Sequence, residues 1–103
     1  MCEDKNTIGN YDFLKNLINY TFIVIHLIYT FNDKYEFCVT ETIPIELWSD
    51  MSINGRRWSI TDYRNGHNVQ AWGLTDKNKF IISELYSEDA SISNIKIHVK
   101  GII

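Results

Sequence analysis

The side chains best suited to chemistry or recognition are concentrated between positions 48 and 74. This stretch contains all three tryptophans and all three arginines of the chain, namely Trp48, Trp58, Trp72, Arg56, Arg57 and Arg64. Guanidinium groups bind phosphate or carboxylate through paired, charge-assisted hydrogen bonds, and tryptophan and arginine are enriched where proteins bind one another. The stretch also contains Ser59, Asp62 and His67, the residue types of a hydrolytic triad. These residue types are therefore compatible with three functions: anion binding, protein recognition and hydrolysis.

Two Asn-Gly dipeptides predict how these side chains are positioned. Asn54-Gly55 and Asn65-Gly66 are the strongest hairpin signals in the chain, because Asn and Gly tolerate the positive φ angles of a two-residue turn. They predict three antiparallel strands, at about 46–53, 56–64 and 67–74. Two-residue turns also set the pairs across the second hairpin, which are Tyr63 with Asn68, Thr61 with Gln70, Ser59 with Trp72, and Arg57 with Leu74.

This register divides the side chains of the three strands between two faces. The apolar face is predicted to join the core, with Met51, Ile53, Trp58, Ile60, Val69 and Ala71. The other face is polar but carries aromatic rings, which makes it a candidate platform for a partner. We predict that the partner-binding residues are Trp48, Arg57, Tyr63, Gln70 and Trp72. The alternative is that an N-terminal helix or a loop covers these rings, and a bulge in either hairpin would exchange the faces.

The three arginines support an alternative kind of site. Arg56, Arg57 and Arg64 flank the two tight turns, where they can hold a phosphate or carboxylate of a small ligand. By parity Arg57 lies on the polar face, with Asp50 placed diagonally to form an ion pair with it. The competing interpretation is that all three are solvated side chains at the hairpin ends.

The same register argues against catalysis. Ser59 is predicted to point to the polar face, whereas Asp62 and His67 point to the core, so the three do not converge. The sequence contains no Gly-x-Ser-x-Gly elbow and no phosphate-binding glycine loop. His26, His67 and His98 fall on separate predicted strands, so neither a metal site nor a cofactor is expected. We expect a protein that is not an enzyme, with His26 hydrogen-bonded in the core and His98 solvated.

Composition narrows the class of protein further. With 103 residues, of which 45% are hydrophobic, the chain suits one globular domain. The net charge of −3 is spread along the chain, which argues against general affinity for nucleic acid or an anionic membrane surface. The longest apolar run, 22–31, is too short to span a bilayer. Cys2 and Cys38 are expected to be reduced thiols, as in the cytoplasm. The chain is rich in Ile, Asn and Lys and has two alanines, a composition that resembles the codon bias of AT-rich bacterial and phage genomes.

The rest of the chain predicts a β-rich fold. Residues 1–9 are expected to be a loose tail, and Asn10 to cap a short helix whose apolar face is Tyr11, Leu14, Leu17 and Ile18. Further strands are predicted at about 20–31, from 35 toward Pro44, at 80–86 and at 95–100. We predict a single mainly β domain over residues 10–103. It is a compact antiparallel meander of about seven strands, either a small barrel or a two-layer sandwich, with one short N-terminal helix.

These features favour a binding protein over a catalyst. The leading hypothesis is a small non-catalytic protein that occupies the surface of a partner protein, as inhibitors of the toxin-immunity or anti-defence type do; this comparison is an analogy based on size and the missing catalytic motifs. One alternative is a binder of a small anionic ligand such as a nucleotide, held by aromatic rings and arginine. Another is a structural homo-oligomer built through the apolar strand at 20–31.

Overall fold

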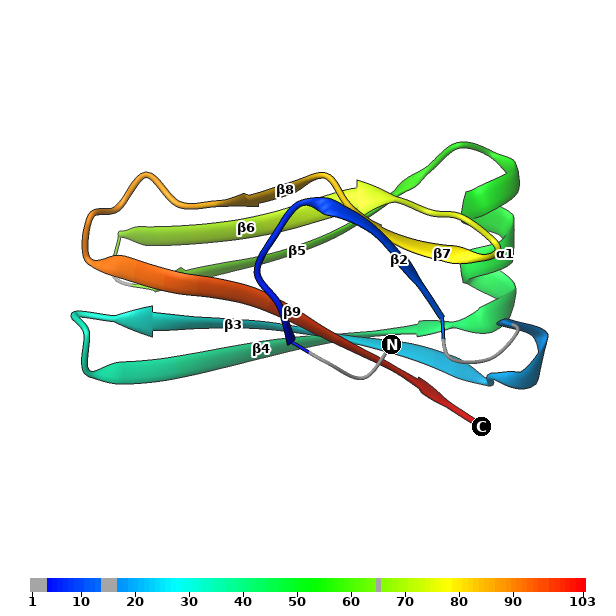
Figure 1. The fold of residues 1–103 in the computed structure, drawn as a ribbon, viewed down its shortest axis with the longest axis horizontal. Coiled ribbons are helices and arrows are strands. Elements are labelled where there is room, and N and C mark those ends of the chain that lie inside the picture. Colours follow the sequence, from blue (N-terminus) through cyan, green and yellow to red (C-terminus); the bar gives the residue numbers. More distant parts are fainter. Residues whose placement is uncertain (1–3, 14–16, 65) are drawn as a thin grey trace.

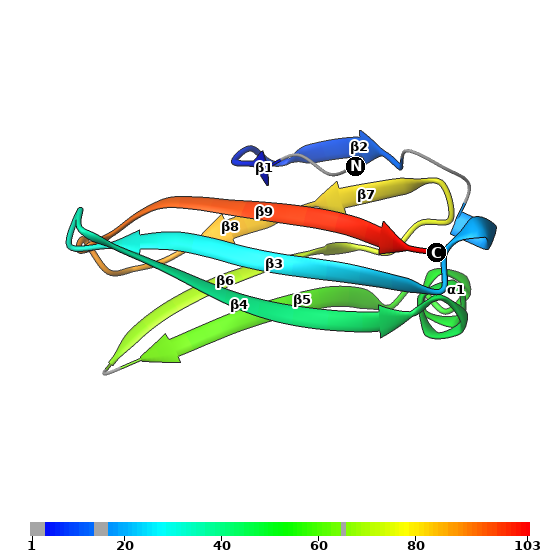
Figure 2. The same cartoon turned by 90° about the horizontal axis from the view of Figure 1, so that it is seen from below.

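The computed structural model describes residues 4–13, 17–64 and 66–103, and its main body is a sandwich of two antiparallel sheets (Figures 1 and 2). The first sheet has the order β1 (Asp4–Lys5), β9 (Ile92–Ile102), β3 (Phe22–Phe31), β4 (Tyr35–Pro44). The second has the order β5 (Arg57–Arg64), β6 (His67–Leu74), β8 (Glu84–Tyr86). A separate pair joins β2 (Gly9–Asp12) to β7 (Lys79–Ile82). The mainly β, antiparallel fold class is confirmed, with two layers rather than a closed barrel.

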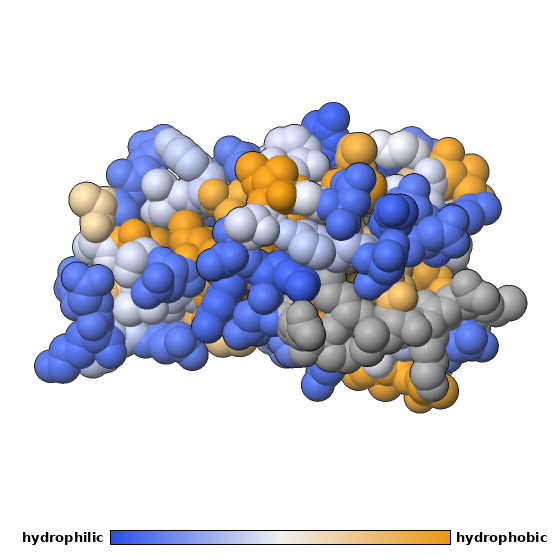
Figure 3. Space-filling model, in the orientation of Figure 1, coloured by the Kyte–Doolittle hydropathy of each residue, from blue (hydrophilic) through white to orange (hydrophobic). Residues whose placement is uncertain are grey.

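Side chains that alternate along the strands fill the space between the two sheets. The first sheet contributes Ile23, Ile25, Leu27, Tyr29, Ile97 and Val99, and all of them are buried. The second contributes Trp58, Ile60, Val69 and Ala71, which are also buried. Period-two alternation places every second residue of a strand on the same face, so these side chains all point into the space between the sheets. On the side of the sandwich that carries β2 and β9, hydrophobic side chains show as separate patches among hydrophilic ones (Figure 3).

The second predicted hairpin is confirmed at every position. β5 pairs with β6 from Arg57 opposite Leu74 to Arg64 opposite His67. Gly66 has a φ of +83°, the left-handed conformation that a two-residue turn requires and that glycine adopts without steric cost. The predicted division of this hairpin into an inner and an outer face therefore holds.

The first predicted hairpin is wrong, because residues 45–53 form the helix α1 (Ile45–Ile53) instead of a strand. Pro44 ends β4, since proline cannot continue the hydrogen-bonding ladder, and stands at the N-cap of the helix. Ile45, Trp48 and Met51 follow at intervals of three, so they share one helix face, and they pack against the core. The period of the apolar residues here is that of a helix.

Asn54-Gly55 ends this helix rather than turning a hairpin. Gly55 has a φ of +66°, and the N–H of Arg56 donates to the carbonyl of Met51 at 2.9 Å. This six-to-one bond with a left-handed glycine is the Schellman arrangement at a helix C-terminus. An Asn-Gly dipeptide satisfies both structures, so the helical spacing before it decided the outcome.

The N-terminal segment also differs from prediction. Asn10 and Tyr11, which were predicted to begin a helix, lie in β2 opposite Ile81 and Phe80. Strand β2 satisfies backbone groups of β7 that would otherwise have no partner strand. A short 3₁₀ helix follows at Leu17–Asn19, whereas Leu14 and the side chain of Ile18 lie outside the described residues. Of the predicted loose tail, Asp4 and Lys5 pair with β9 as β1, and residues 1–3 are likewise not described.

The strand predicted at 80–86 is divided into β7 and β8. The division lies where the chain crosses β6 closely: a Cβ added at Gly73 would lie 1.7 Å from the carbonyl oxygen of Ile81. The same carbonyl accepts a hydrogen bond from Trp58 Nε1 at 2.9 Å. Ser83 N–H then donates to the Trp72 carbonyl at 2.9 Å, after which β8 runs beside β6. In the described part of the chain, no helix is long and apolar enough to cross a membrane.

Candidate functional site

Strands β5, β6 and β8 present an outer face with Trp72 at its centre. Across the register, Trp72 lies between Ser59 on β5 and Glu84 on β8. The indole Nε1–H donates to the Glu84 carboxylate, and the guanidinium of Arg57 lies 4.8 Å from the centroid of the indole ring. Because the hydrogen bond and the cation–π contact act on different parts of the ring, together they hold Trp72 in one orientation.

Exposed side chains share this face of the sheet with the tryptophan. Tyr63, Leu74 and Tyr86 are 72%, 43% and 40% exposed. Gln70 stands opposite Tyr86 in the register, on the same face. Four of the predicted partner-binding residues are therefore brought together on one surface, which we call the outer face and define as Arg57, Tyr63, Gln70, Trp72, Glu84 and Tyr86. Glu84 and Tyr86 were missed, because the sequence does not reveal the register of β8.

Trp48, the fifth predicted contact residue, is not on this face. It lies on α1 with no exposed surface, and its Nε1 donates to the carbonyl of Asp76 at 2.8 Å. Its ring stacks on that of Phe80, with centroids 6.0 Å apart. The prediction is wrong because the helix turns Trp48 into the core. Asp50 also lies on α1, where its carboxylate accepts a hydrogen bond from Asn54 rather than facing Arg57 across a sheet.

The three arginines do not form one anion site. Arg57 and Arg64 lie seven residues apart on β5, which corresponds to about 23 Å at the rise of an extended strand. They also point to opposite faces, because their positions differ in parity. Arg56 precedes Arg57 at the end of β5 that follows α1. A single small ligand can therefore reach Arg64 without touching the other two.

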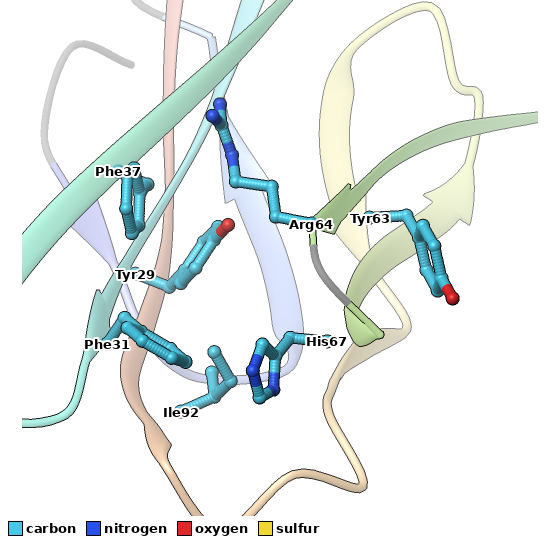
Figure 4. Close-up of a pocket in the computed structure, with 7 residues that line it drawn as sticks. All are labelled: Tyr29, Phe31, Phe37, Tyr63, Arg64, His67 and Ile92. Atoms are coloured by element: carbon cyan, nitrogen blue, oxygen red, sulfur yellow. The ribbon is translucent and has the colours of Figure 1, made fainter.

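Arg64 lines a cavity of about 460 Å³ at the end of the sandwich where the β3–β4 and β5–β6 hairpins turn (Figure 4). We call this the end cavity, and its walls are Tyr29, Phe31, Phe37, Tyr63, Arg64, His67 and Ile92. Figure 4 shows the rings of Tyr29, Phe31 and Phe37 on one side, with Tyr63 directed away from them. Arg64 and His67 approach from the β5–β6 hairpin.

Behind the end cavity, Asp62 anchors both Tyr29 and Arg64. Its Oδ2 accepts the Tyr29 O–H at 2.5 Å and the Arg64 Nε–H at 2.7 Å. Burial favours the protonated carboxyl, but hydrogen bonds from Tyr29 and Arg64 outweigh it and lower the pKa of Asp62. Burial of Tyr29, together with its bond to Asp62, raises the pKa of the phenol to about 12. Asp62 is thus ionised and Tyr29 neutral near pH 7.

On the other side of the end cavity, His67 is held by Asp89. The His67 Nδ1 bonds to the Asp89 carboxylate, and the imidazole packs edge-on against Phe31 with centroids 4.6 Å apart. Hydrogen bonds from Ser91 and His67 lower the pKa of Asp89 to about 2. Because an ionised carboxylate only accepts hydrogen bonds, Nδ1 carries the proton of this bond. Nε2 is the ring nitrogen that does not bond to Asp89.

The triad residue types are spread over three environments. Ser59 is exposed on the outer side of β5, whereas Asp62 is buried and bonded to Tyr29 and Arg64. His67 is bonded to Asp89 instead. No proton-transfer chain joins Ser59 to the other two.

Another cluster lies on the outer side of the first sheet. His26 Nδ1 is 2.8 Å from Thr40 Oγ1 and 3.9 Å from Cys38 Sγ, and its ring lies 5.8 Å from that of His98. The prediction that His26 is a core residue is wrong, because its parity on β3 turns it to the outer side of the sheet, where it is only partly buried. Partial burial and the charges of His98 and Lys100 lower the pKa of His26. Among the described residues, no group of three or more His, Cys, Asp or Glu side chains is arranged to hold a metal ion.

Comparisons with known proteins return no relative of this chain. No protein-family model matches it, and neither a curated protein nor a solved structure does.

Proposed function

We propose that the chain is a non-catalytic binding protein that acts by occupying the surface of a partner protein through its outer face. The observation that carries this proposal is the stacked pair of Arg57 and Trp72, on the same face of the sheet as the exposed rings of Tyr63 and Tyr86. Tryptophan, tyrosine and arginine dominate the energetics of protein interfaces, because each buries a large area and still offers a hydrogen bond. An inhibitor of the toxin-immunity or anti-defence type is the narrower form of this proposal, by analogy of size.

The chemistry of the outer face specifies what the partner must offer. Within the described contacts, Arg57 meets the Trp72 ring and forms no ion pair with a carboxylate. A partner with an acidic side chain opposite Arg57, inside an otherwise apolar patch, would complete both interactions. Around the pair, Thr61 and Asn68 supply a polar rim.

A second copy of the chain is a less favoured partner. Strand β3, which the sequence marked as a possible oligomer interface, lies between β9 and β4. Both of its edges are therefore already hydrogen-bonded. Light scattering of the purified chain separates self-association from capture of a different protein.

The experiment is affinity capture from a lysate of the organism that encodes the chain, with variants that separate the outer face from the rest of the surface. Tyr63→Ala and Trp72→Ala are each expected to reduce capture of the same protein by about tenfold or more, the loss typical of an aromatic hot spot. Tyr35→Ala is the matched control, because Tyr35 is 51% exposed and, like Trp72, contacts a cation, Lys34 at 5.3 Å, but lies on β4.

Circular dichroism of each variant establishes that the fold is retained. Capture of one protein by the wild type and by Tyr35→Ala, lost in the two outer-face variants, supports the proposal. Equal capture by all four proteins, or no captured protein, contradicts it.

A further inference from the structure

We infer that the end cavity is a binding site for a small planar aromatic ring that carries a single carboxylate. The site shares only Tyr63 with the outer face, and its existence does not depend on the proposed protein partner. Its volume of about 460 Å³ lies within the range of ligand pockets in proteins, roughly 300–1,000 Å³.

The walls of the end cavity favour a planar ring. Tyr29 and Phe37 lie with centroids 5.7 Å apart, and Phe31 and Phe37 with centroids 6.3 Å apart, so the aromatic surface is continuous. Ile92 completes the apolar lining beside Phe31 and His67 (Figure 4). Aromatic rings stack in offset or edge-on arrangements at these separations, which an aromatic ligand can extend.

Arg64 supplies the group that recognises the carboxylate. Its guanidinium is held in place on two sides, by the Nε–H bond to Asp62 at 2.7 Å and by the Phe37 ring at 4.8 Å. The Nε bond leaves the Nη groups to donate to an acceptor in the cavity, and a carboxylate can accept from both of them. Because the side chain is already ordered, binding a ligand costs less conformational entropy.

The charges around the cavity limit the ligand to one negative charge. Arg64 is bonded to Asp62 and His67 Nδ1 to Asp89, and the lowered pKa values keep both carboxylates ionised near pH 7. One guanidinium and two ionised carboxylates therefore lie beside the cavity, so a phosphate dianion would be repelled more strongly than a ligand with a single negative charge. A monocarboxylate can accept hydrogen bonds from the Nη groups of Arg64, and His67 Nε2 is available to a polar atom at the other end of the ring.

The test uses three probes that share a ring and differ in charge: 2-naphthoate, 2-naphthamide and 2-naphthyl phosphate. Titration calorimetry of the wild-type protein should give saturable binding of 2-naphthoate, with the amide and the phosphate each roughly tenfold weaker or more. Amide chemical shifts in a ¹⁵N-labelled sample should change at residues 29–37, at 63, 64, 66 and 67, and at 92. Changes confined to the outer face would place the ligand elsewhere and overturn the inference.

Two variants on the same strand provide matched arginine substitutions. Arg64→Lys retains a cation for Asp62, which protects the fold, but lacks the guanidinium fork, so 2-naphthoate should bind roughly tenfold more weakly. Arg57→Lys alters the other ring-stacked arginine of β5 and should leave this binding unchanged. Absence of saturable 2-naphthoate binding, or equal binding by wild type and Arg64→Lys, overturns the inference. Neither result affects the capture experiment, which depends on Tyr63 and Trp72.

Discussion

Strand β5 carries an arginine near each end, and the two side chains differ in what they have left to bind. Both guanidinium groups lie 4.8 Å from an aromatic centroid, Arg57 over Trp72 and Arg64 over Phe37. Arg64 also bonds to Asp62, a buried carboxylate, whereas Arg57 meets no carboxylate among the described residues. Contact with a ring orients an arginine, but a buried carboxylate makes it part of the folded structure. The Arg64 pair is therefore expected to support stability as well as to hold the guanidinium at the end cavity, whereas the Arg57 pair is expected to support recognition alone.

The largest difference in stability between the two sites is expected when the carboxylate that anchors each of them is removed, Asp62 at the end cavity and Glu84 on the outer face. Asp62→Ala leaves Arg64 and the Tyr29 hydroxyl without their acceptor, so the free energy of unfolding should fall by about 2–3 kcal/mol. Glu84→Ala removes the half-exposed acceptor of the Trp72 indole and should cost about 0.5–1 kcal/mol. Urea denaturation at pH 7 measures both. Equal losses would remove the distinction between the two ends of β5.

Alkaline pH should lower the free energy of unfolding by ionising Tyr29, which lines the end cavity. The folded-state pKa of about 12 exceeds the ordinary value of 10.0, so the phenol ionises more readily in the unfolded chain. The stability that depends on neutral Tyr29 is complete below pH 10 and is lost as the pH rises toward 12. Tyr29→Phe should lose less stability than the wild type between these values in urea titrations. Parallel curves for the two proteins would contradict this expectation.

Acid should also lower the free energy of unfolding, by protonating Asp89, which holds His67 at the end cavity. Its folded-state pKa of about 2 lies below the ordinary value of 3.8, so the unfolded chain takes up the proton first. The contribution of Asp89 is complete above about pH 4 and is lost as the pH falls toward 2. Asp89→Asn should show a shallower decline of stability over this interval. Asp62, whose pKa is also lowered, adds a loss of the same sign.

The smallest effect on stability is expected at Arg57 itself. Arg57→Gln removes an exposed cation–π contact, which should change the free energy of unfolding by about 0.5 kcal/mol. Capture of the partner protein should nevertheless weaken, because the acidic group of the partner loses its guanidinium. Thermal denaturation and affinity capture of the same sample separate the two effects. A large loss of stability with unchanged capture would assign Arg57 to the fold.

The two Asn-Gly dipeptides show how far local sequence determines this fold. Asn65-Gly66 follows a strand of alternating polarity, and the register predicted from it is correct at each pair of β5 and β6. Asn54-Gly55 follows Ile45, Trp48 and Met51 at helical spacing, and there the dipeptide ends a helix. Both structures need a left-handed glycine, so the dipeptide alone is ambiguous. Because residues 46–53 were predicted to form a strand, Trp48 was wrongly predicted to lie on the surface.

The end cavity and part of the outer face depend on contacts that the sequence does not reveal. Tyr29 and Phe37 lie beside Arg64 and His67 only because the β3–β4 and β5–β6 hairpins, which are far apart in sequence, turn at the same end of the sandwich. Tyr86 joins the outer face because the chain crosses β6 at Gly73, where a Cβ would meet the Ile81 carbonyl. Packing between layers is set by side chains distant along the chain, whereas alternation within one strand is local.

Hydroxyl-radical footprinting of the chain with and without its captured partner tests the central claim most directly. Tyr63, Trp72 and Tyr86 lie on the outer face, whereas Tyr35 is 51% exposed on β4 and serves as an internal reference. The account predicts that the partner reduces oxidation of the first three while Tyr35 reacts at the same rate. Protection of Tyr35 with unchanged oxidation of Tyr63, Trp72 and Tyr86 would contradict it.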